Sequence, residues 1–330
     1  MQIFPLFLSF LKKVLPKPSI IMDKTLGYSN QINHLKKLLK HKEWELLENQ
    51  LAKADSSELS LFIDYLAVTD EDNADLLSQW YTARPKRLYP LLVSSKHFML
   101  WAWDARTGAY AKDVEDSAWE LFFQRLDIAK EMLEEAMRIE PKHSEAYHQF
   151  ITLGMAHNGV SKTEAIAKLN EVSKGHFSAQ CNIVYSLVER WGGKEGEALD
   201  YAYNFCNDVP KGSAFHALIA SVHVDRWVGL EYDERENYFS QRGVRDDIFN
   251  AYEYAFPDEV FSDDIDSILA LNLFAFCFYQ GKRKTIASKI LVFLDGRTGE
   301  SPWQYINTFM SLVDENYTYS SVYNECKIAL

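Results

Sequence analysis

Apolar residues recur at every third or fourth position along most of the chain. Between Asn30 and Ala54 they repeat in this way on both sides of the polar run Lys40-His41-Lys42. This spacing places apolar side chains on one face of a helix, so the segment predicts two amphipathic helices separated at that run. A third helix is expected to begin with Ser56 as its cap, and a fourth to end before Pro85.

The chain contains no convincing segment with the alternating apolar and polar residues of a half-buried strand. The most strand-like run is LVFL at residues 291–294. It continues a helical series that includes Ile286 and Ile290, and we therefore expect it to lie in a helix. The pattern as a whole predicts an all-α protein of roughly fifteen helices.

The helices of the second half end at a regular interval. The ends are marked near Pro141, Gly175 and Pro210, about 34 and 35 residues apart. This is the period of a tetratricopeptide repeat, in which each unit is a pair of helices joined by a turn. The next marker, Pro257, comes later than the period requires, which indicates an insertion around residues 227–243.

A helix pair cannot bury its apolar face alone, whereas stacked pairs form a continuous core and leave one concave surface free. We therefore expect an α-α superhelix, a tetratricopeptide-like helical-repeat solenoid, over residues 30–330. Its last pair is expected to turn at Gly281, and a softer junction is expected near residues 228–245. Residues 1–29 form an apolar and basic N-terminal arm.

The composition is that of a folded protein with a large aromatic core. Of the 330 residues, 47% are hydrophobic and 14% are aromatic. The formal net charge of −12 argues against a nucleic-acid partner, because phosphate contacts need a basic face.

Acidic residues are concentrated in residues 231–266, where only three arginines accompany them. Such a run is a solvated face in one interpretation and a docking surface for a basic partner in the other. In the second interpretation Asp263, Asp264 and Asp266 are candidate partner-binding residues.

The four cysteines are scattered, and no two have the spacing of a zinc or redox motif. Cys181, Cys206 and Cys277 lie in apolar helical patterns, which predicts buried thiols. This usage fits a reducing compartment and a cytoplasmic protein.

The first residues of the chain allow three interpretations. The opening run has no charge before Lys12, is too short to span a bilayer, and lacks the basic start and cleavage site of a signal peptide. It could lie on a lipid surface, pack on the body of the protein, or precede a native start at Met22. Membrane contact is therefore expected only through residues 1–20, as peripheral association.

The Gly192-Gly193-Lys194 run invites comparison with a phosphate-binding loop. That loop needs an earlier glycine, but Val occupies position 188, and it needs Ser or Thr after the lysine, where Glu195 stands. The preceding residues have helical spacing. We therefore expect the two glycines to end a helix, with glycine adopting the left-handed conformation.

Three short segments together resemble an uncharacterised bacterial family, domain of unknown function 4034. They are a turn, a helix and an earlier aromatic segment, comprising Arg190, Trp191, Gly192 and Gly193; His223, Val224, Asp225, Arg226 and Trp227; and Ala102, Trp103, Ala105 and Arg106. The resemblance covers about residues 35–230 and departs from the family pattern at Val222 and Thr107. It implies a tetratricopeptide-like fold and carries no known activity.

Candidate functional residues follow from the same segments. Large aromatic and arginine side chains are favoured in protein interfaces, although they also pack between helix pairs. The partner-binding candidates among them are Trp103, Arg106, Trp191, Asp225, Arg226 and Trp227. His216 and His223 lie two helical turns apart, too far to share a metal alone, and are expected to be satisfied structural histidines.

The sequence therefore predicts a non-enzymatic module that binds a protein or peptide partner through a groove of the helical array. No catalytic, cofactor-binding or metal-ligating residues are assigned. Two alternatives stay open. One is a bacterial immunity-type inhibitor that neutralises a basic toxin through residues 231–266. The other is an enzyme with an unrecognised pocket between helices.

Overall fold

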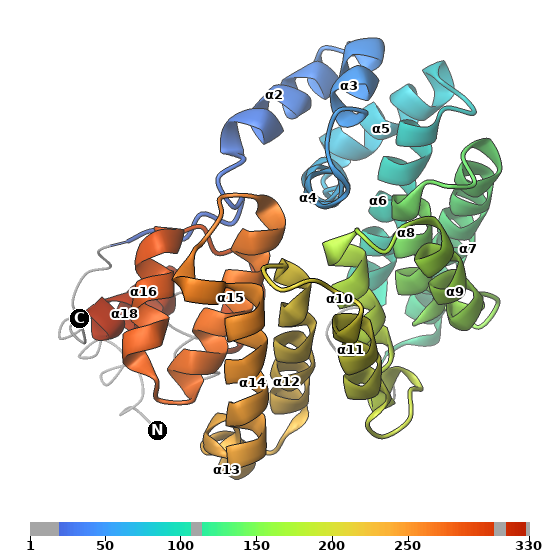
Figure 1. Ribbon diagram of the computed structural model, residues 1–330. Coiled ribbons are helices and arrows are strands. Elements are labelled where there is room, and N and C mark those ends of the chain that lie inside the picture. Colours follow the sequence, from blue (N-terminus) through green and yellow to red (C-terminus); the bar gives the residue numbers. More distant parts are fainter. Residues whose placement is uncertain (1–19, 107–113, 307–314, 328–330) are drawn as a thin grey trace, which may run out of the picture.

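The computed structural model describes residues 20–106, 114–306 and 315–327, and the regular elements in these ranges are all helices (Figure 1). The described residues form 16 α-helices, close to the number expected from the sequence. Asp23 and Arg297 form an isolated bridge. The prediction of an all-α fold is confirmed, and residues 291–294 lie in a helix as expected. The expectations for residues 1–19 lie outside the described residues.

The α-helices are α2 (Ser29–Lys40), α3 (Trp44–Leu51), α4 (Ser56–Leu66), α5 (Glu71–Ala83), α6 (Leu88–Arg106), α7 (Asp116–Ile139), α8 (Ser144–Gly154), α9 (Lys162–Val172), α10 (Phe177–Ser186), α11 (Glu197–Asn207), α12 (Leu218–Gly229), α13 (Tyr232–Arg235), α14 (Arg242–Ala255), α15 (Ile265–Gln280), α16 (Lys284–Leu294) and α18 (Glu315–Lys327). The short 3₁₀ helices are η2 (Glu189–Trp191), η3 (Ala214–Ala217), η4 (Tyr238–Ser240), η5 (Pro257–Glu259) and η6 (Trp303–Tyr305).

From α6 onward the helices stack as successive pairs. The pairs are α6 with α7, α8 with α9, α10 with α11, α12 with α14, and α15 with α16. Figure 1 shows α10, α12, α14 and α15 side by side. The expected insertion is present as α13 and η4 between α12 and α14, and the last pair turns at Gly281. The fold is therefore compatible with the predicted helical-repeat superhelix.

The helix boundaries follow local signals in the sequence. The polar run at residues 40–42 separates α2 from α3, as predicted, and Lys42 has a positive φ of 60°. The cap of α4 was placed one residue too late. Asp55 is the N-cap and accepts hydrogen bonds from the backbone of Ser57 and Glu58, while Glu58 accepts from the backbone of Asp55. This reciprocal capping box satisfies donors that Ser56, already inside the helix, cannot reach.

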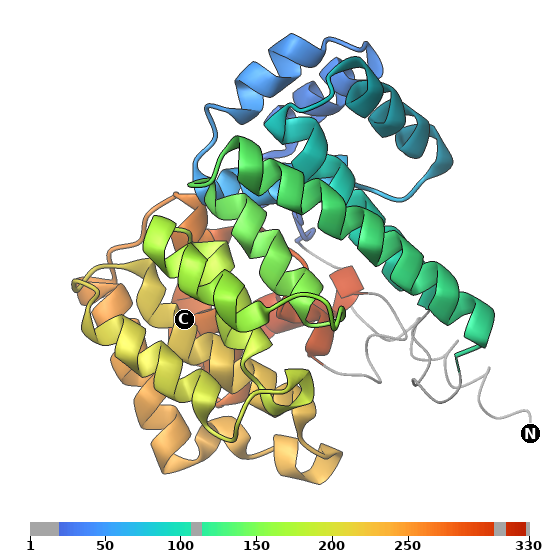
Figure 2. The ribbon, with the colours of Figure 1, turned by 90° about the vertical axis from the view of Figure 1, so that its right-hand side faces the viewer.

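The first four helices do not simply continue the stack of pairs. In Figures 1 and 2, α2 to α5 lie together at one edge of the array. Helix α4 crosses this edge and packs against α6, α8, α10 and α15. It meets α8 and α10 near their N-terminal ends, where Ser60 contacts Glu145 and His176 and Ser56 contacts the carbonyl of Gly175. The edge of the array is thus covered by a segment from far earlier in the chain.

The beginning of the described chain also contacts its end. The backbone of Asp23 donates to the carbonyl of Gly296 at 2.7 Å and accepts from the amide of Thr298 at 3.2 Å. Ser320 of α18 donates to the carbonyl of Ile20. These contacts hold residues 20–28 against the last helix pair.

The buried apolar residues form two large clusters. One contains residues between Ile32 and Val160, and the other contains residues between Phe177 and Cys326. Leu26 belongs to the second cluster, while Tyr28 and Leu61 pack against both. The N-terminal helices therefore join the two halves of the core.

The Gly192-Gly193 run forms a tight helix-ending turn, as predicted. Gly192 adopts a left-handed φ of 84° at the end of η2. A Cβ atom on Gly193 would lie only 1.8 Å from the carbonyl oxygen of Leu187. Gly192 is required by its backbone conformation, and Gly193 is required by the lack of space for a side chain. The turn therefore explains both glycines, and no phosphate-binding role is needed.

Candidate functional site

Several of the residues selected from the sequence meet in one cluster. We call it the aromatic–arginine cluster and define it as Trp103, Arg106, Trp119, Tyr185, Arg190, Trp191 and Asp225. Trp103 of α6 and Trp191 of η2 pack edge to face, with ring centroids 6.4 Å apart. The guanidinium of Arg106 lies 5.1 Å from the Trp103 ring and 5.3 Å from the Trp119 ring. Cation–π contacts of this kind stabilise a packed arrangement. Trp119, at the start of α7, was not among the residues selected.

Asp225 joins this region through an ion pair with Arg190. Arg190 in turn lies over the ring of Tyr185, 4.9 Å from its centroid. Burial raises the pKa of the Asp225 carboxyl, and Arg190 offsets only part of that effect. The charged members of the cluster are thus engaged within the chain. Tyr185 was also missed, since a single tyrosine in an apolar helix carries no sequence signal.

The other two selected residues lie in a different place. Trp227 is buried against Phe239 and Phe276, and its indole nitrogen donates to the carbonyl of Arg235 at 3.1 Å. Arg226 lies beside the hydroxyl of Tyr238. The structure therefore separates this pair from the aromatic–arginine cluster, although all of them belong to the segments with family resemblance.

Two of the three candidate acids have a role within the fold. Asp263 pairs with Arg297 at 2.7 Å, and Asp264 caps α15 by accepting from the backbone of Ser267 at 2.8 Å. Asp266 is half-buried, and its Oδ1 has no hydrogen-bond partner in the described structure. Burial raises the pKa of Asp266 to about 6. These arrangements do not need a basic partner.

The histidines selected as structural are satisfied, as predicted. The ring of His216 lies 3.2 Å from the carbonyl oxygen of Pro210. The ring of His223 contacts the Tyr238 hydroxyl at 2.9 Å and Asp247 at 3.2 Å.

All four cysteines are free thiols. Cys206, Cys277 and Cys326 are buried, and Cys181 is half-buried. Burial raises the pKa of each thiol, which leaves it unreactive near neutral pH.

Exposed aromatic side chains gather around α14, which lies within the acidic run at residues 231–266, although none of these aromatic residues was selected from the sequence. Phe249 is 40% exposed and Tyr254 is 55% exposed. Each lines a groove beside the helix, of about 410 Å³ and 360 Å³ respectively, and Asn250 lines both. We call this region the α14 surface and define it by Tyr203, Arg245, Phe249, Asn250, Tyr254 and Arg283.

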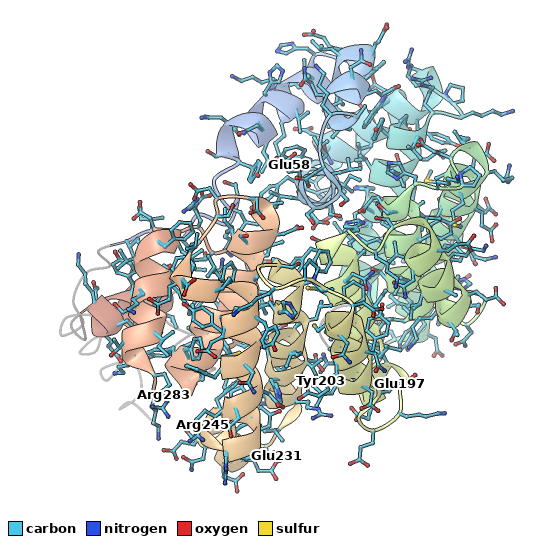
Figure 3. All side chains as sticks on the ribbon, viewed as in Figure 1. Glu58, Glu197, Tyr203, Glu231, Arg245 and Arg283 are labelled. Atoms are coloured by element: carbon cyan, nitrogen blue, oxygen red, sulfur yellow. The ribbon has the colours of Figure 1, made fainter. Side chains whose placement is uncertain are left out.

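The arginines of the α14 surface lie in the groove that Phe249 lines, whereas Asp247 faces the groove that Tyr254 lines. Arg245, from α14, and Arg283, from the turn before α16, face this groove together with Asp246. Figure 3 shows Arg245 and Arg283 near the same end of the molecule, with Tyr203 further along on α11. Arg245 already contacts Asp246 at 2.8 Å. Arg283 is exposed, and its guanidinium is therefore accessible to a ligand.

A second unassigned feature is the polar centre, which we define as Ser60, Glu145, His148 and His176. Ser60 of α4 donates to Glu145 Oε2 at 2.5 Å and lies 2.9 Å from His176 Nε2. His148 Nδ1 lies 3.1 Å from the same carboxylate oxygen. Glu145 and His148 come from the start of α8, and His176 is the N-cap of α10.

The polar centre is buried, which governs its charges. Glu145 is 2% exposed and His176 is fully buried. Burial opposes ionisation of Glu145, but His148 and the Ser60 hydroxyl more than offset this, so the pKa of the carboxyl lies well below its usual range. Burial lowers the pKa of His176 to about 3, so its imidazole is neutral. Glu145 and His148 stand three residues apart, a spacing that could have indicated the centre.

No protein family, curated protein or solved structure matches this chain. The resemblance to the domain of unknown function 4034 family therefore stays a prediction. Within the described residues, none of the helices combines the length and the apolar character needed to cross a bilayer.

Proposed function

We propose that the protein is a binding module that recognises a peptide or helical segment of another protein on the α14 surface. The observation that carries the proposal is the pair of adjoining grooves on either side of α14, each lined by an exposed aromatic ring. Grooves between helices are a common site for extended or helical partner segments.

The side chains of the α14 surface have the chemistry of a recognition site. Exposed rings such as Phe249 and Tyr254 lose contact with water when a partner covers them, and this gain is concentrated in a few aromatic and arginine residues. By contrast, the rings of the aromatic–arginine cluster already pack on one another. Phe249 and Tyr254 are more exposed than Trp103, Trp119 and Trp191, which are half-buried.

The arginines of the α14 surface favour a partner segment that carries a carboxylate. Arg245 and Arg283 face the groove against one acid, Asp246. An arginine guanidinium binds a carboxylate through paired hydrogen bonds. The preferred partner segment would thus combine apolar anchors for the two grooves with an acidic residue near Arg283.

The test is capture of partners by the full chain from its source cells, followed by calorimetry with the purified partner. Replacing both Phe249 and Tyr254 with alanine should weaken binding by about 2 kcal/mol or more, roughly 30-fold. The matched control replaces Leu46 and Leu121, which are similarly exposed on α3 and α7, and should bind as the wild type does. A partner that binds both double variants equally would move the interface away from α14.

A further inference from the structure

We propose that the polar centre is a closed binding site for a divalent transition-metal ion, best matched by Zn²⁺, that fastens α4 to α8 and α10. This inference is independent of the proposed partner binding on α14. It assigns a ligand to residues that the sequence analysis did not select.

The four atoms lie close enough together to surround a single ion. Zn²⁺ bonds of about 2.0–2.1 Å place tetrahedral ligand atoms about 3.3 Å from one another. Glu145 Oε2 lies 3.1 Å from His148 Nδ1 and 3.7 Å from His176 Nε2. Ser60 Oγ lies 2.5, 2.9 and 3.4 Å from Glu145 Oε2, His176 Nε2 and His148 Nδ1. The two ring nitrogens are within 4.8 Å of each other.

The donor set selects the kind of ion. Two imidazoles and one carboxylate form a typical zinc ligand set, whereas Ca²⁺ and Mg²⁺ prefer oxygen ligands throughout. With Ser60 Oγ as the fourth ligand, the ion would have no position left open for a substrate. A closed, buried site of this kind is structural, not catalytic.

Hydrogen bonds outside the four atoms hold the ligands in position. His176 Nδ1 lies 3.1 Å from the Ser144 hydroxyl. The second carboxylate oxygen of Glu145 accepts from Gln149 at 3.0 Å, and Gln149 accepts from Ser95 at 2.7 Å. Such outer contacts fix ring and carboxylate orientation at metal sites. The side chain of His148 is 15% exposed, which gives an ion a route from solvent.

The convergence of two rings on one carboxylate distinguishes this centre from the other histidine–acid contacts. His157 with Asp127 and His223 with Asp247 each involve one ring. Across residues 20–106, 114–306 and 315–327, the polar centre is the one group of three such side chains with ligand atoms this close. A hydrogen-bonded network of the same atoms without an ion is the competing explanation. The experiment has to distinguish it from a metal site.

The experiment uses the full chain without a polyhistidine tag, stripped with a chelator and then titrated with zinc chloride. Calorimetry and elemental analysis after gel filtration should give one zinc per chain. Co²⁺ in its place should show the intense visible absorption of a tetrahedral site. Zinc should also raise the unfolding temperature, because an ion bound to the folded chain stabilises it.

Three variants test the assignment of ligands. His148→Gln and Glu145→Gln each remove a ligand. Each should lower the zinc affinity by more than about 100-fold, which is the largest loss expected from removing an outer contact. Ser144→Ala removes only an outer contact and should weaken binding by about 10- to 100-fold. The matched control is His157→Gln, which breaks a histidine–acid pair elsewhere and should keep wild-type zinc affinity.

Two results would overturn the proposal. The first is a stripped wild-type chain that takes up no stoichiometric zinc or cobalt, which would leave a hydrogen-bonded network. The second is zinc uptake that His148→Gln and Glu145→Gln leave unchanged, which would place the ion elsewhere. If these variants fail to fold, anomalous scattering at the zinc edge from wild-type crystals soaked in zinc decides by locating the ion.

Discussion

Trp103 and Trp191 pack edge to face although they belong to different helix pairs. Trp103 is near the end of α6, and Trp191 is in η2 after α10, with their ring centroids 6.4 Å apart. Trp191 also lies 6.0 Å from the ring of Tyr185. The contact links the first pair of the array to the third, so it should contribute to the cooperativity of unfolding.

A double-mutant cycle measures this link. Trp103→Ala and Trp191→Ala should each lower the free energy of unfolding by about 3 kcal/mol, because each removes a large, half-buried ring. The pair should show a coupling of about 1 kcal/mol, the typical value for edge-to-face rings. Chemical denaturation followed by circular dichroism gives both quantities. The control cycle of Trp103 with Trp227, which packs elsewhere, should be additive within about 0.5 kcal/mol.

Gly193 should be the least replaceable glycine of the turn after α10. Alanine there would place a Cβ atom 1.8 Å from the Leu187 carbonyl oxygen, so the backbone would have to shift. We expect Gly193→Ala to destabilise the protein by about 3 kcal/mol, in the upper range for single substitutions. Urea midpoints measure the loss. Gly175→Ala, which meets nothing within 4 Å, should cost less than about 1 kcal/mol, and equal losses would refute the steric account.

A buried carboxylate in the N-terminal helices should make the protein sensitive to acid. Glu48 is 3% exposed and accepts from Trp80, Arg84 and Arg87. Burial opposes its charge, but the hydrogen bonds from Arg84 and Arg87 outweigh this and lower the pKa of Glu48 below the usual 4.5. The stabilisation is therefore complete above pH 4.5 and is lost as the pH falls through the lower folded-state pKa.

Glu48→Gln should accordingly lower the free energy of unfolding by about 2 kcal/mol at pH 7. The reason is that Arg84 and Arg87 would donate their hydrogen bonds to a neutral amide instead of a charged carboxylate. The difference from wild type should shrink as the pH falls below 4.5. Denaturation series between pH 3 and 7 measure it. Glu120→Gln, exposed on α7, is the control and should change stability little at any pH. A difference that stays constant down to pH 3 would argue against the ion pairs as its source.

The helices and their pairing could be predicted because their signals are local. The spacing of apolar residues, the polar run at residues 40–42 and the markers at Pro141, Gly175 and Pro210 each act within a few turns. The crossing of α4 could not be predicted in the same way. Its contacts join Ser60 to Glu145 and His176, which are far apart in the chain and belong to three different segments.

Some of the candidate site residues could likewise be predicted from the sequence, whereas others could not. Trp103, Arg106 and Trp191 were selected from the sequence, and the structure brings them together. The exposure of Phe249 and Tyr254 could not be deduced, because the same residues in a helix can face the core or the solvent. Only the packing of neighbouring helices decides which face is covered.

The contribution of Asp266 to the free energy of unfolding should be more favourable in mild acid than at neutral pH. Burial raises the pKa of Asp266 from the usual 3.8 to about 6, with the nearby Asp55 and Asp264 adding to the shift. Between these two values the folded state holds a proton that the unfolded state has released. The free energy of unfolding therefore falls as the pH rises through this window, and the full penalty applies above pH 6.

Asp266→Asn removes this penalty because the amide carries no charge. We expect the variant to be more stable than wild type at pH 7, by at most about 3 kcal/mol, and to match it near pH 4. Thermal and urea denaturation at pH 4, 5, 6 and 7 trace the difference. Asp263→Asn, which alters an exposed ion pair with Arg297, is the control and should change stability by less than about 1 kcal/mol. A variant that is less stable than wild type at pH 7 would contradict this prediction. It would show that the surroundings of the Asp266 carboxylate stabilise its charge more than burial destabilises it.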